Sequence, residues 1–471
     1  MKSFKQKLLV LLLLLCVAPL FAQEYSKGAI LDPVRYSQIE VKPTLVSRNY
    51  TSIPRAVSLK DYCPIPENQG PYSTCVGWST AFAARTISES IALTRTNRTT
   101  TSNNVFSPTH VYKNIADNEG KDGAFIGRAL EFMKNYGIAK RTDTEKSMYA
   151  ANNFRGISLS IFANERKYPI SGYVTLFANP TGVPGTINER VPPVKKSLAE
   201  KMPVVIGMNC TNSFQYAKDI WRPTESPYGR YGGHAMCVIG YDDDKYGGAF
   251  EIQNSWGTNW GNAGYIWISY SDFAAFVAEA YAVVENLANY TEDVRFAASI
   301  DIVVLNDSRG MPVTYDRQGF YKTHLTYPEG TVFQYQMTNR QAAYVYAFSM
   351  DNKSPALERV FPAPGVSPIL DYRESTVAWP GEYTGMELSG PADTDYLVVL
   401  YSKEELDIGA IERRFANERG SFPERVQKAV GSNFIPFNNV QYNSGKMEFT
   451  ASTQNQKAVL GLLLAIDRQK R

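Results

Sequence analysis

Hydrophobic residues recur along the first part of the chain with the spacing of helices that bury one face. Ser107 and Pro108 fit the cap and the first position of the second such helix, and Gly137 fits the end of the third. We therefore predict a helical region before residue 140. The predicted helices lie within 76–91, 106–115 and 123–138.

From about residue 200 the pattern changes to short runs rich in β-branched and aromatic residues, separated by Gly, Asp and Asn. Such runs predict strands joined by tight turns. The runs before residue 290 are MPVVIGMNC, HAMCVIGYDDD, GAFEIQNSW and GYIWISY. Those beyond it are GTVFQYQMTN, AAYVYAFSM, TVAWP, DYLVVLYS and AVLGLLLAI, with a helical interlude at AIERRFANER. The run AVLGLLLAI is shorter than the roughly 20 apolar residues of a membrane-spanning helix, so it is interpreted as a buried strand.

These patterns divide the chain into two domains, which its 471 residues allow. We predict an α+β domain over 53–290, in which a helical half precedes a strand-rich half. The sequence ENLANYTED lies at its end. A linker over 291–298 then leads to a mainly β domain over 299–471.

The first residues follow the order of a Sec-type signal peptide, with three lysines, the apolar run LLVLLLLLCVAPLF and the small residue Ala22. We predict a signal peptide over 1–22, followed by a segment over 23–52 without clear periodicity. The alternatives are an uncleaved anchor, for which the run is short, and lipid attachment at Cys16, which Leu15 disfavours. The chain is therefore expected to be exported to an extracytoplasmic location.

Charge and cysteine content narrow the function classes. The formal net charge of +3 indicates neither nucleic acid nor an anionic membrane as partner. Loss of the signal peptide would leave four cysteines, which allow two disulfides or one disulfide with free thiols. These are Cys63, Cys75, Cys210 and Cys237.

Cys75 stands where a Gly/Pro-rich turn gives way to the first predicted helix. A thiol attacks as the thiolate, which a helix N-terminus and a nearby histidine both favour. The chain has three histidines. His110, near a helix start, and His324, in the second domain, are interpreted as structural. His234, at the head of a strand, is the candidate base.

Asn254 ends the next predicted strand, across a hairpin turn at DDDKYGG. Antiparallel pairing would place its carboxamide beside His234, where it can hold one ring nitrogen while the other faces the thiol. The backbone N–H of Cys75 and the side-chain amide of Gln69 are available as donors to an oxyanion. Together these residues predict nucleophilic catalysis by a thiol.

Residues 53 to about 290 resemble the papain-like cysteine peptidases. ENQGPYSTCVGWS is similar to that family's active-site helix, GGHAMCVIGYD to its histidine strand and IQNSWGTNWGNAGYIWI to its asparagine segment. The resemblance implies a two-lobe fold, with a helical lobe, a β-barrel-like lobe and the active site in the cleft between them. It also implies Cys75 as nucleophile, His234 as base and acid, Asn254 as orienter of the imidazole and Gln69 as oxyanion donor.

Other positions match the family less completely. The resemblance implies that Trp256 shields the Asn–His hydrogen bond and that Trp260 walls the leaving-group side, with core packing as the alternative for both. Of a Gly-Gly pair that binds substrate backbone, only Gly123 is matched, with Ala124 beside it. The segment over 23–52 is too short for the long helical propeptide of many members.

The predicted function is that of a secreted, bacterial cysteine endopeptidase that acts on proteins or peptides through an acyl-enzyme thioester. No metal or organic cofactor is expected. The alternatives are an inactive peptidase-like binding module and an exopeptidase or transferase of the same fold. The second domain resembles an accessory domain of bacterial peptidases, for which substrate binding, partner binding or structural support is expected.

Overall fold

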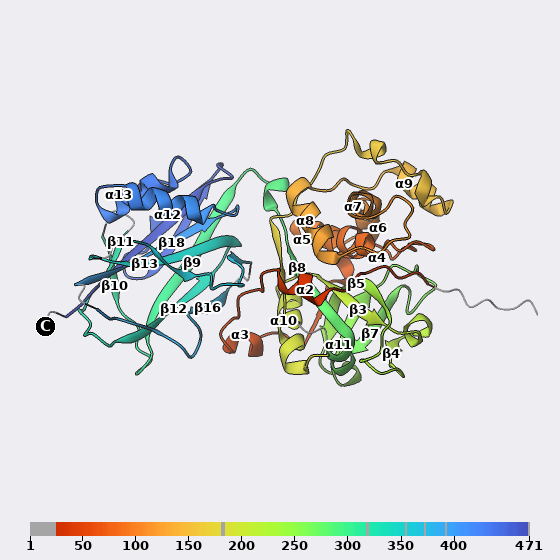
Figure 1. Ribbon diagram of the computed structural model, residues 1–471, viewed down its shortest axis with the longest axis horizontal. Coiled ribbons are helices and arrows are strands. Elements are labelled where there is room, and N and C mark those ends of the chain that lie inside the picture. Colours follow the sequence, from red (N-terminus) through yellow and green to blue (C-terminus); the bar gives the residue numbers. More distant parts are fainter. Residues whose placement is uncertain are drawn as a thin grey trace, which may run out of the picture.

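The computed structural model describes residues 25–179, 184–316, 320–353, 356–371, 374–390 and 393–469. They form two bodies that lie side by side along the long axis of the molecule (Figure 1). The body drawn in red to green contains the active-site motifs, and the one drawn in blue-green and blue contains the C-terminal region. The predicted signal peptide over 1–22, with Cys16, lies outside the described residues.

Helices form one half of the first body. A continuous helix runs through α4 (Cys75–Gly77), the π-helical η2 (Trp78–Arg85) and α5 (Thr86–Ala92). It packs against α7 (Pro108–Ile115) and α8 (Ile126–Tyr136). Ser107 caps α7 and Gly137 ends α8, so the three predicted helices are confirmed. The shorter elements are α6 (Arg98–Ser102), α9 (Asp143–Ala150), η1 (Lys60–Tyr62), η3 (Phe154–Gly156) and η4 (Leu159–Phe162).

The contact between α4 and α7 requires a glycine. A Cβ at Gly77 would lie 2.3 Å from the carbonyl oxygen of Pro108, far inside van der Waals contact. Gly77 lies two residues after Cys75, so this backbone approach fixes the start of the helix that carries the thiol.

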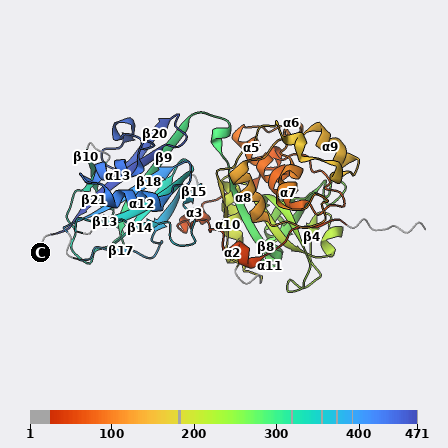
Figure 2. The same ribbon diagram turned by 45° about the horizontal axis from the view of Figure 1, so that its top comes forward.

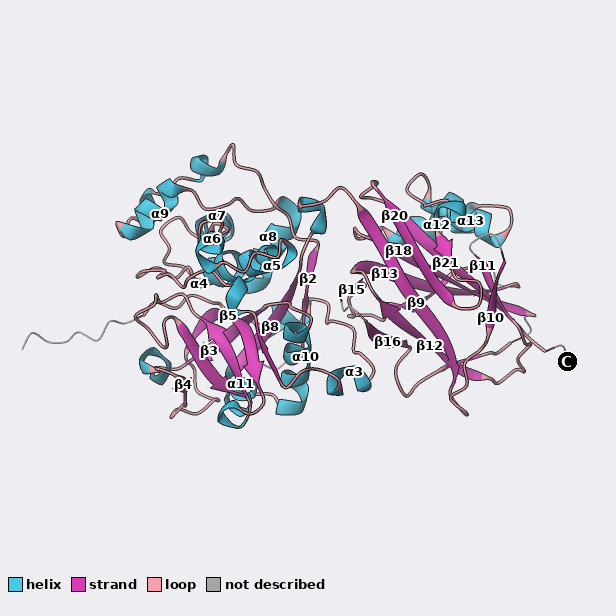
Figure 3. Ribbon diagram, turned by 180° about the vertical axis from the view of Figure 1, so that it is seen from behind, coloured by secondary structure: helices cyan, strands magenta, loops and turns pink. Residues whose placement is uncertain are grey.

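A largely antiparallel sheet forms the other half of the first body (Figure 3). Its strand order is β2-β8-β3-β5-β6-β7-β4, and β1 pairs with β5. The four runs predicted as strands in this region are confirmed as β3, β5, β6 and β7. The strands are β1 (Ala56–Ser58), β2 (Gly172–Thr175), β3 (Val204–Cys210), β4 (Ile220–Trp221), β5 (Gly232–Asp242), β6 (Ala249–Gln253), β7 (Tyr265–Ser269) and β8 (Val277–Val284), accompanied by α10 (Ile187–Ala199), η5 (Ser213–Tyr216), η6 (Lys245–Gly247) and α11 (Tyr270–Phe276).

Two sheets form the C-terminal domain. One has the order β10-β11-β21-β18-β13-β14, with β15 beside β13, and the other has the order β16-β12-β9-β20-β19, with β17 beside β12. The strands are β9 (Val294–Val304), β10 (Val313–Asp316), β11 (Phe320–Thr323), β12 (Val332–Asn339), β13 (Ala343–Asp351), β14 (Glu358–Phe361), β15 (Ile369–Leu370), β16 (Ser375–Trp379), β17 (Met386–Glu387), β18 (Thr394–Ser402), β19 (Gln441–Tyr442), β20 (Met447–Thr453) and β21 (Val459–Asp467).

Alternate side chains of strand β13 face the two sides of its sheet. Val345 and Ala347 belong to the core between the two sheets, whereas Tyr346 and Phe348 belong to the cluster that includes the adjoining helices. Those helices are α12 (Ile408–Asn417) and α13 (Phe422–Val430), with η8 (Phe437–Asn439) following. The run AVLGLLLAI is the buried strand β21, as predicted.

Two elements differ from the sequence predictions. Strand β9 starts at Val294, inside the predicted linker over 291–298, because inward-facing residues already alternate from Val294 and Phe296 onward. The connection between the domains is therefore shorter and contains η7 (Leu287–Asn289). Helix α13 was not predicted, although the capping box of Ser421 and Glu424 is a sequence signal for it.

The segment predicted over 23–52 is described from Tyr25 and contains α2 (Pro33–Ser37) and α3 (Arg48–Thr51). Helix α3 lies between the two bodies in each ribbon view, including the turned view of Figure 2. This segment therefore contacts both domains before strand β1 of the first body begins.

We predict that Gly77→Ala lowers the free energy of unfolding by about 1–3 kcal/mol, because the added methyl group forces α4 and α7 apart. Gly445→Ala is the matched control, because a Cβ there meets nothing within 4 Å. Urea unfolding of both variants measures the difference. Equal stability of the two variants would contradict the close contact at Gly77.

Candidate active site

Cys75 begins α4 at the junction of the helical half and the sheet, and its side chain is completely buried. A tight turn precedes it, in which Gly70 has a φ of +69°. Desolvation raises the pKa of Cys75, and the backbone N–H groups of Ala235, Gly28 and Val76, which lie near the sulfur, oppose that rise. Ala235 directly follows His234, so the thiol lies beside the histidine strand.

His234 and Asn254 are brought together by the pairing of β5 with β6, in which Cys237 lies opposite Gln253. The distance from His234 Nε2 to Asn254 Oδ1 is 2.8 Å. The Ser255 N–H also donates to Asn254 Oδ1, at 2.8 Å, which identifies this atom as an acceptor. His234 Nε2 must therefore carry the hydrogen, and Nδ1 keeps a free lone pair.

That second nitrogen is the one required for base catalysis. His234 Nδ1 is buried and has no hydrogen-bond partner among the described residues. A base needs such an unoccupied lone pair within reach of the proton that it removes. The tautomer set by Asn254 thus equips His234 to accept the proton of Cys75.

Trp256 covers the His234–Asn254 pair, and its ring stacks on the imidazole with centroids 4.6 Å apart. Trp260 lies farther back: it is 2% exposed, meets Trp256 edge-on and donates its Nε1–H to Gln215 O. Its surroundings are those of a core residue, which was the alternative considered for both tryptophans.

Gln69 is fixed in a single orientation. Its Oε1 accepts the hydroxyl of Ser255 at 2.6 Å, so its Nε2 is free to donate in the opposite direction. Nε2 donates to Tyr72 O at 2.7 Å and to Ser26 O at 3.2 Å. The amide predicted as an oxyanion donor therefore already binds a carbonyl oxygen of the N-terminal segment.

Residues 25–32, called the strap below, cover the catalytic residues. The ring of Tyr25 stacks on Trp256 at 4.8 Å, and Ser26 O also accepts the Trp256 indole N–H at 3.0 Å. Both Gly28 and the next residue donate to Gly233 O, beside His234. The strap thus lies over Trp256 and Gly233, next to His234.

The strap runs parallel to the segment predicted to bind substrate backbone. Ala29 forms a parallel bridge with Ala124, whose N–H donates to Gly28 O at 2.8 Å. A Cβ at Gly123 would lie 2.7 Å from Gly28 O. The predicted position Gly123 therefore contacts the strap. Gly28 itself admits no side chain, because a Cβ there would lie 2.1 Å from Ser73 O.

Leu31 of the strap packs beside Gly207, a contact that sequence reasoning missed. A Cβ at Gly207 would meet Leu31, Ile126 and Glu279, which therefore converge at this point. Glu279 accepts the N–H of Asp32 at 3.1 Å, and desolvation raises the pKa of Glu279 to about 7. The signal in the sequence is a single acid within the apolar run VAEAYAVV.

Burial determines the protonation of the catalytic pair beneath the strap. Desolvation raises the pKa of Cys75 to about 12 and lowers the pKa of His234 to about 4. The hydrogen bond with Asn254 opposes the second shift, whereas the positive charge of Lys27 adds to it. At neutral pH the pair is a neutral thiol and a neutral imidazole, with about 10³-fold less thiolate than an ordinary cysteine would have.

The other candidate residues have structural surroundings. Cys63, Cys210 and Cys237 are free and buried, so neither of the disulfide arrangements considered from the sequence is present. His110 Nδ1 accepts the N–H of Ala139, and His324 pairs with a threonine hydroxyl in the C-terminal domain. Among the described residues, the helices lack the length and apolar character needed to cross a membrane.

A thiol at a helix start, an imidazole with one free nitrogen and a carboxamide that fixes its tautomer define a site for nucleophilic catalysis by cysteine. Residues 61–284 match the family described as papain family cysteine protease. This part of the chain is therefore similar to the papain-family cysteine proteases, and it has the predicted α+β fold, with a helical half and a sheet. The family match ends before the C-terminal domain.

Known proteins and solved structures are similar to about half of this chain. Fruit bromelain from Ananas comosus is 26% identical over 46% of this chain and 55% of its own length, so the chain spans about half of that relative. Macrodontain-1 from Ananas macrodontes is 27% identical over 46% of this chain and 88% of its own length. Among solved structures, xylellain from Xylella fastidiosa is 21% identical over 56% of this chain and 97% of its own, with a TM-score of 0.43.

We predict that the chain beginning at Gln23 releases no thiol to Ellman's reagent while folded and four thiols after unfolding in guanidinium chloride. All four cysteines are free and fully buried, so the reagent reaches them only when the fold is lost. Detection of two thiols after unfolding would instead reveal a disulfide.

A second prediction concerns Glu279. Its pKa is raised from 4.5 to about 7, so the folded chain retains a proton that the unfolded chain loses as pH rises between these values. The free energy of unfolding should therefore fall by about 1–3 kcal/mol from pH 4 to pH 8 relative to Glu279→Gln. Urea unfolding tests this, with the exposed Glu292→Gln as the charge control. Parallel curves for wild type and Glu279→Gln would refute the shift.

Proposed function

We propose that the chain is the latent form of a cysteine endopeptidase that hydrolyses peptide bonds through Cys75 and His234. The observation that carries this proposal is the hydrogen bond from His234 Nε2 to Asn254 Oδ1, which leaves Nδ1 free as a base. His234 directly precedes Ala235, whose backbone N–H lies near the Cys75 sulfur. The family match of residues 61–284 supports the same reaction.

The reaction begins when His234 Nδ1 takes the proton of Cys75 and the sulfur attacks the peptide carbonyl carbon. The developing oxyanion is bound by the backbone N–H of Cys75 and by Gln69 Nε2. His234 then gives its proton to the departing amine, and a thioester forms. Water, deprotonated by His234, attacks the thioester and releases the carboxylic acid with the thiol restored.

The strap has to leave before this sequence can start. Its Ser26 carbonyl occupies the Gln69 donor, and its backbone covers His234 through Gly233. Departure of the strap restores water to the site. Hydration removes the desolvation that now disfavours the thiolate and the imidazolium.

We also place the protein outside the cytoplasm, as a secreted and bacterial member of the family. The signal-peptide pattern over 1–22 supports export, and the accessory-domain resemblance supports the bacterial assignment. Its substrates are proteins or peptides, consistent with an open backbone edge at Gly123 and Ala124 once the strap has left.

Displacement of the strap tests the proposal. Gly28→Val introduces a side chain against Ser73 O, where even a Cβ would lie at 2.1 Å, so we expect the strap to be expelled. The variant should react with a thiol-directed epoxide probe and cleave an unfolded protein under reducing conditions, whereas the wild type remains latent. Val34→Ala, at an exposed position of α2, is the matched control and should also remain latent.

Three further changes in the Gly28→Val chain test which residues carry the reaction. Cys75→Ala should abolish labelling and cleavage, whereas Cys237→Ala, which removes a buried thiol elsewhere, should preserve both. Asn254→Ala should lower kcat/KM by about 10²-fold, because the imidazole loses its fixed tautomer. If the Gly28→Val chain neither reacts nor cleaves, the inactive binding module is the correct description; cleavage confined to chain ends would indicate an exopeptidase.

A further inference from the structure

Beyond the strap, the N-terminal segment passes between the two domains as a strand shared by both. Val41 exchanges two hydrogen bonds of 2.9 Å with residues 365–367 of the C-terminal domain. On the opposite side, Lys42 donates its N–H to Thr175 O at 2.9 Å, and the Thr175 N–H donates to Glu40 O at 3.1 Å. One extended segment thus joins the sheet of the protease domain to the C-terminal domain.

A buried ion pair fixes this strand. Lys42 Nζ lies 2.8 Å from Asp371 Oδ1, and the two side chains are 1% and 2% exposed. Glu200 of the protease domain accepts the Ser375 hydroxyl at 3.1 Å and pairs with Lys196 at 2.7 Å. A buried charge is strongly destabilised without its partner, so Lys42 resists leaving this position.

The following residues enter the C-terminal domain itself. Leu45 is 2% exposed and belongs to the core between the two sheets. Val46 donates to Thr376 O at 3.0 Å, and the Thr376 N–H donates to Asn49 Oδ1 at 3.0 Å. Residues 40–50, called the anchor below, are therefore held by hydrogen bonds, an ion pair and apolar burial together.

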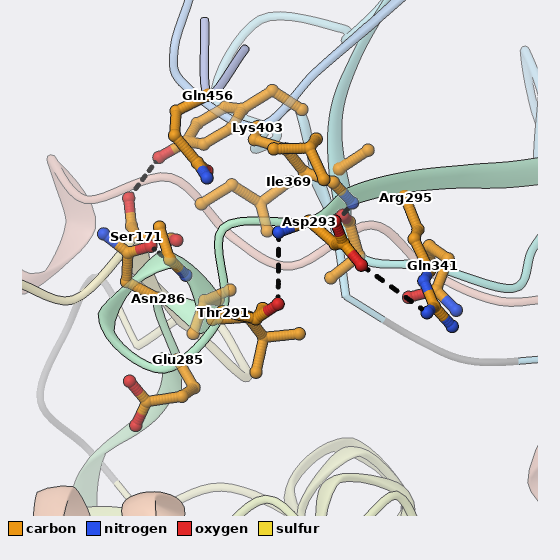
Figure 4. Close-up of a pocket in the computed structure, with 17 residues that line it drawn as sticks. Ser171, Glu285, Asn286, Thr291, Asp293, Arg295, Gln341, Ile369, Lys403 and Gln456 are labelled. Carbon is orange, nitrogen blue, oxygen red and sulfur yellow. Dashed lines mark hydrogen bonds and ion pairs between the residues drawn. The ribbon is translucent and has the colours of Figure 1, made fainter. Parts of the chain in front are cut away.

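The interface is looser where the chain crosses between the domains. A cavity of about 290 Å³ separates them there, lined by Ser171 and Asn286 on one side and by Lys403 and Gln456 on the other (Figure 4). The Tyr344 hydroxyl crosses to Ser171 O at 2.5 Å.

The link between strap and anchor is accessible. It consists of α2 and the turn after it, where Val34 is 64% exposed and both Ser37 and Gln38 are exposed. Tyr36 is the buried residue of this link and donates its hydroxyl to Phe177 O at 2.7 Å. A peptidase can reach this link without disturbing the anchor.

We propose that the C-terminal domain holds the anchor, and thereby keeps the strap in the cleft, until a second peptidase hydrolyses the exposed link near Ser37 and Gln38. This inference rests on the proposed function, because it assigns the release step of the same thiol site. While tethered, the strap has a high effective concentration at the cleft. Hydrolysis of the link, with one water consumed, turns the strap into a separate peptide that dilutes away and leaves the domains joined.

The position of the cut distinguishes this mechanism from simple loss of the N-terminus. Two full-length chains would carry the same inserted recognition sequence of a specific protease, one between Ser37 and Gln38 and the other between Ser52 and Ile53. The first cut lies between strap and anchor. The second lies beyond the anchor, so the strap stays attached to a segment that both domains hold. Epoxide labelling of Cys75 is measured before and after cutting, at several dilutions.

We expect the first cut to raise the labelling rate at least about tenfold, with a further rise on dilution. The second cut should leave the rate within about twofold of the uncut chain, and the N-terminal fragment should coelute in size-exclusion chromatography. Equal activation by both cuts would overturn the proposal, as would latency after the first cut while the Gly28→Val chain is active. Failure of Gly28→Val to react would refute the proposed function instead.

Three changes in the anchor of the second chain, Val41→Pro, Lys42→Met and Leu45→Ala, test the role of the C-terminal domain. They remove the N–H that donates to Gly365 O, the ion pair with Asp371 and the buried leucine side chain. The backbone N–H of residue 42 still binds Thr175, on the protease side. The second cut should then activate the enzyme, whereas Val34→Ala in the same chain stays latent. Thermal unfolding confirms that both domains remain folded. Continued latency of the folded triple variant would show that the C-terminal domain does not hold the strap; if the variant does not fold, the comparison of the two cuts decides.

Discussion

The hydrogen bond between His234 and Asn254 is the contact on which the chemistry of this site depends. The amide orientation is fixed by the Ser255 N–H, and the orientation in turn selects the imidazole tautomer. If the amide were reversed, the ring would carry its hydrogen on Nδ1 and would have no lone pair for the thiol. Pairing of β5 with β6 brings both residues to one place, and the ring of Trp256 stacks on the imidazole.

Burial affects the Cys75–His234 pair in opposite ways when the pair is active and when the strap covers it. An active thiol–imidazole pair benefits from limited water, because the charges of the transition state interact more strongly in a low dielectric. Complete burial under the strap instead disfavours both charged forms, and Lys27 places a positive charge near the imidazole. The strap therefore covers Cys75 and His234, and the burial it contributes to keeps the thiol protonated.

The N-terminal segment connects the two domains to the catalytic cleft. Its first residues are held by backbone hydrogen bonds, whereas Lys42 and Leu45 are held by a buried charge and by a hydrophobic core. These interactions differ in kind, since exchangeable backbone contacts suit a removable inhibitor and buried side chains suit a permanent attachment. The accessory domain thereby acquires a physical connection to a site that it does not itself touch.

The sequence alone determined the elements whose signals are local. Ser107, Pro108 and Gly137 marked helix ends, alternating apolar residues marked the strands, and the contexts of Cys75 and His234 marked the catalytic pair. Contacts between distant segments were decided only by the tertiary structure. The path of residues 25–50 has no periodicity to reveal it, because its backbone–backbone bonds to other elements pair with segments more than ninety residues away. Glu279 likewise became part of the site only when the fold placed it against Leu31 and Asp32. Local patterns follow from the geometry of a helix or strand, whereas burial, and with it the protonation of Cys75, depends on every segment that packs around the residue.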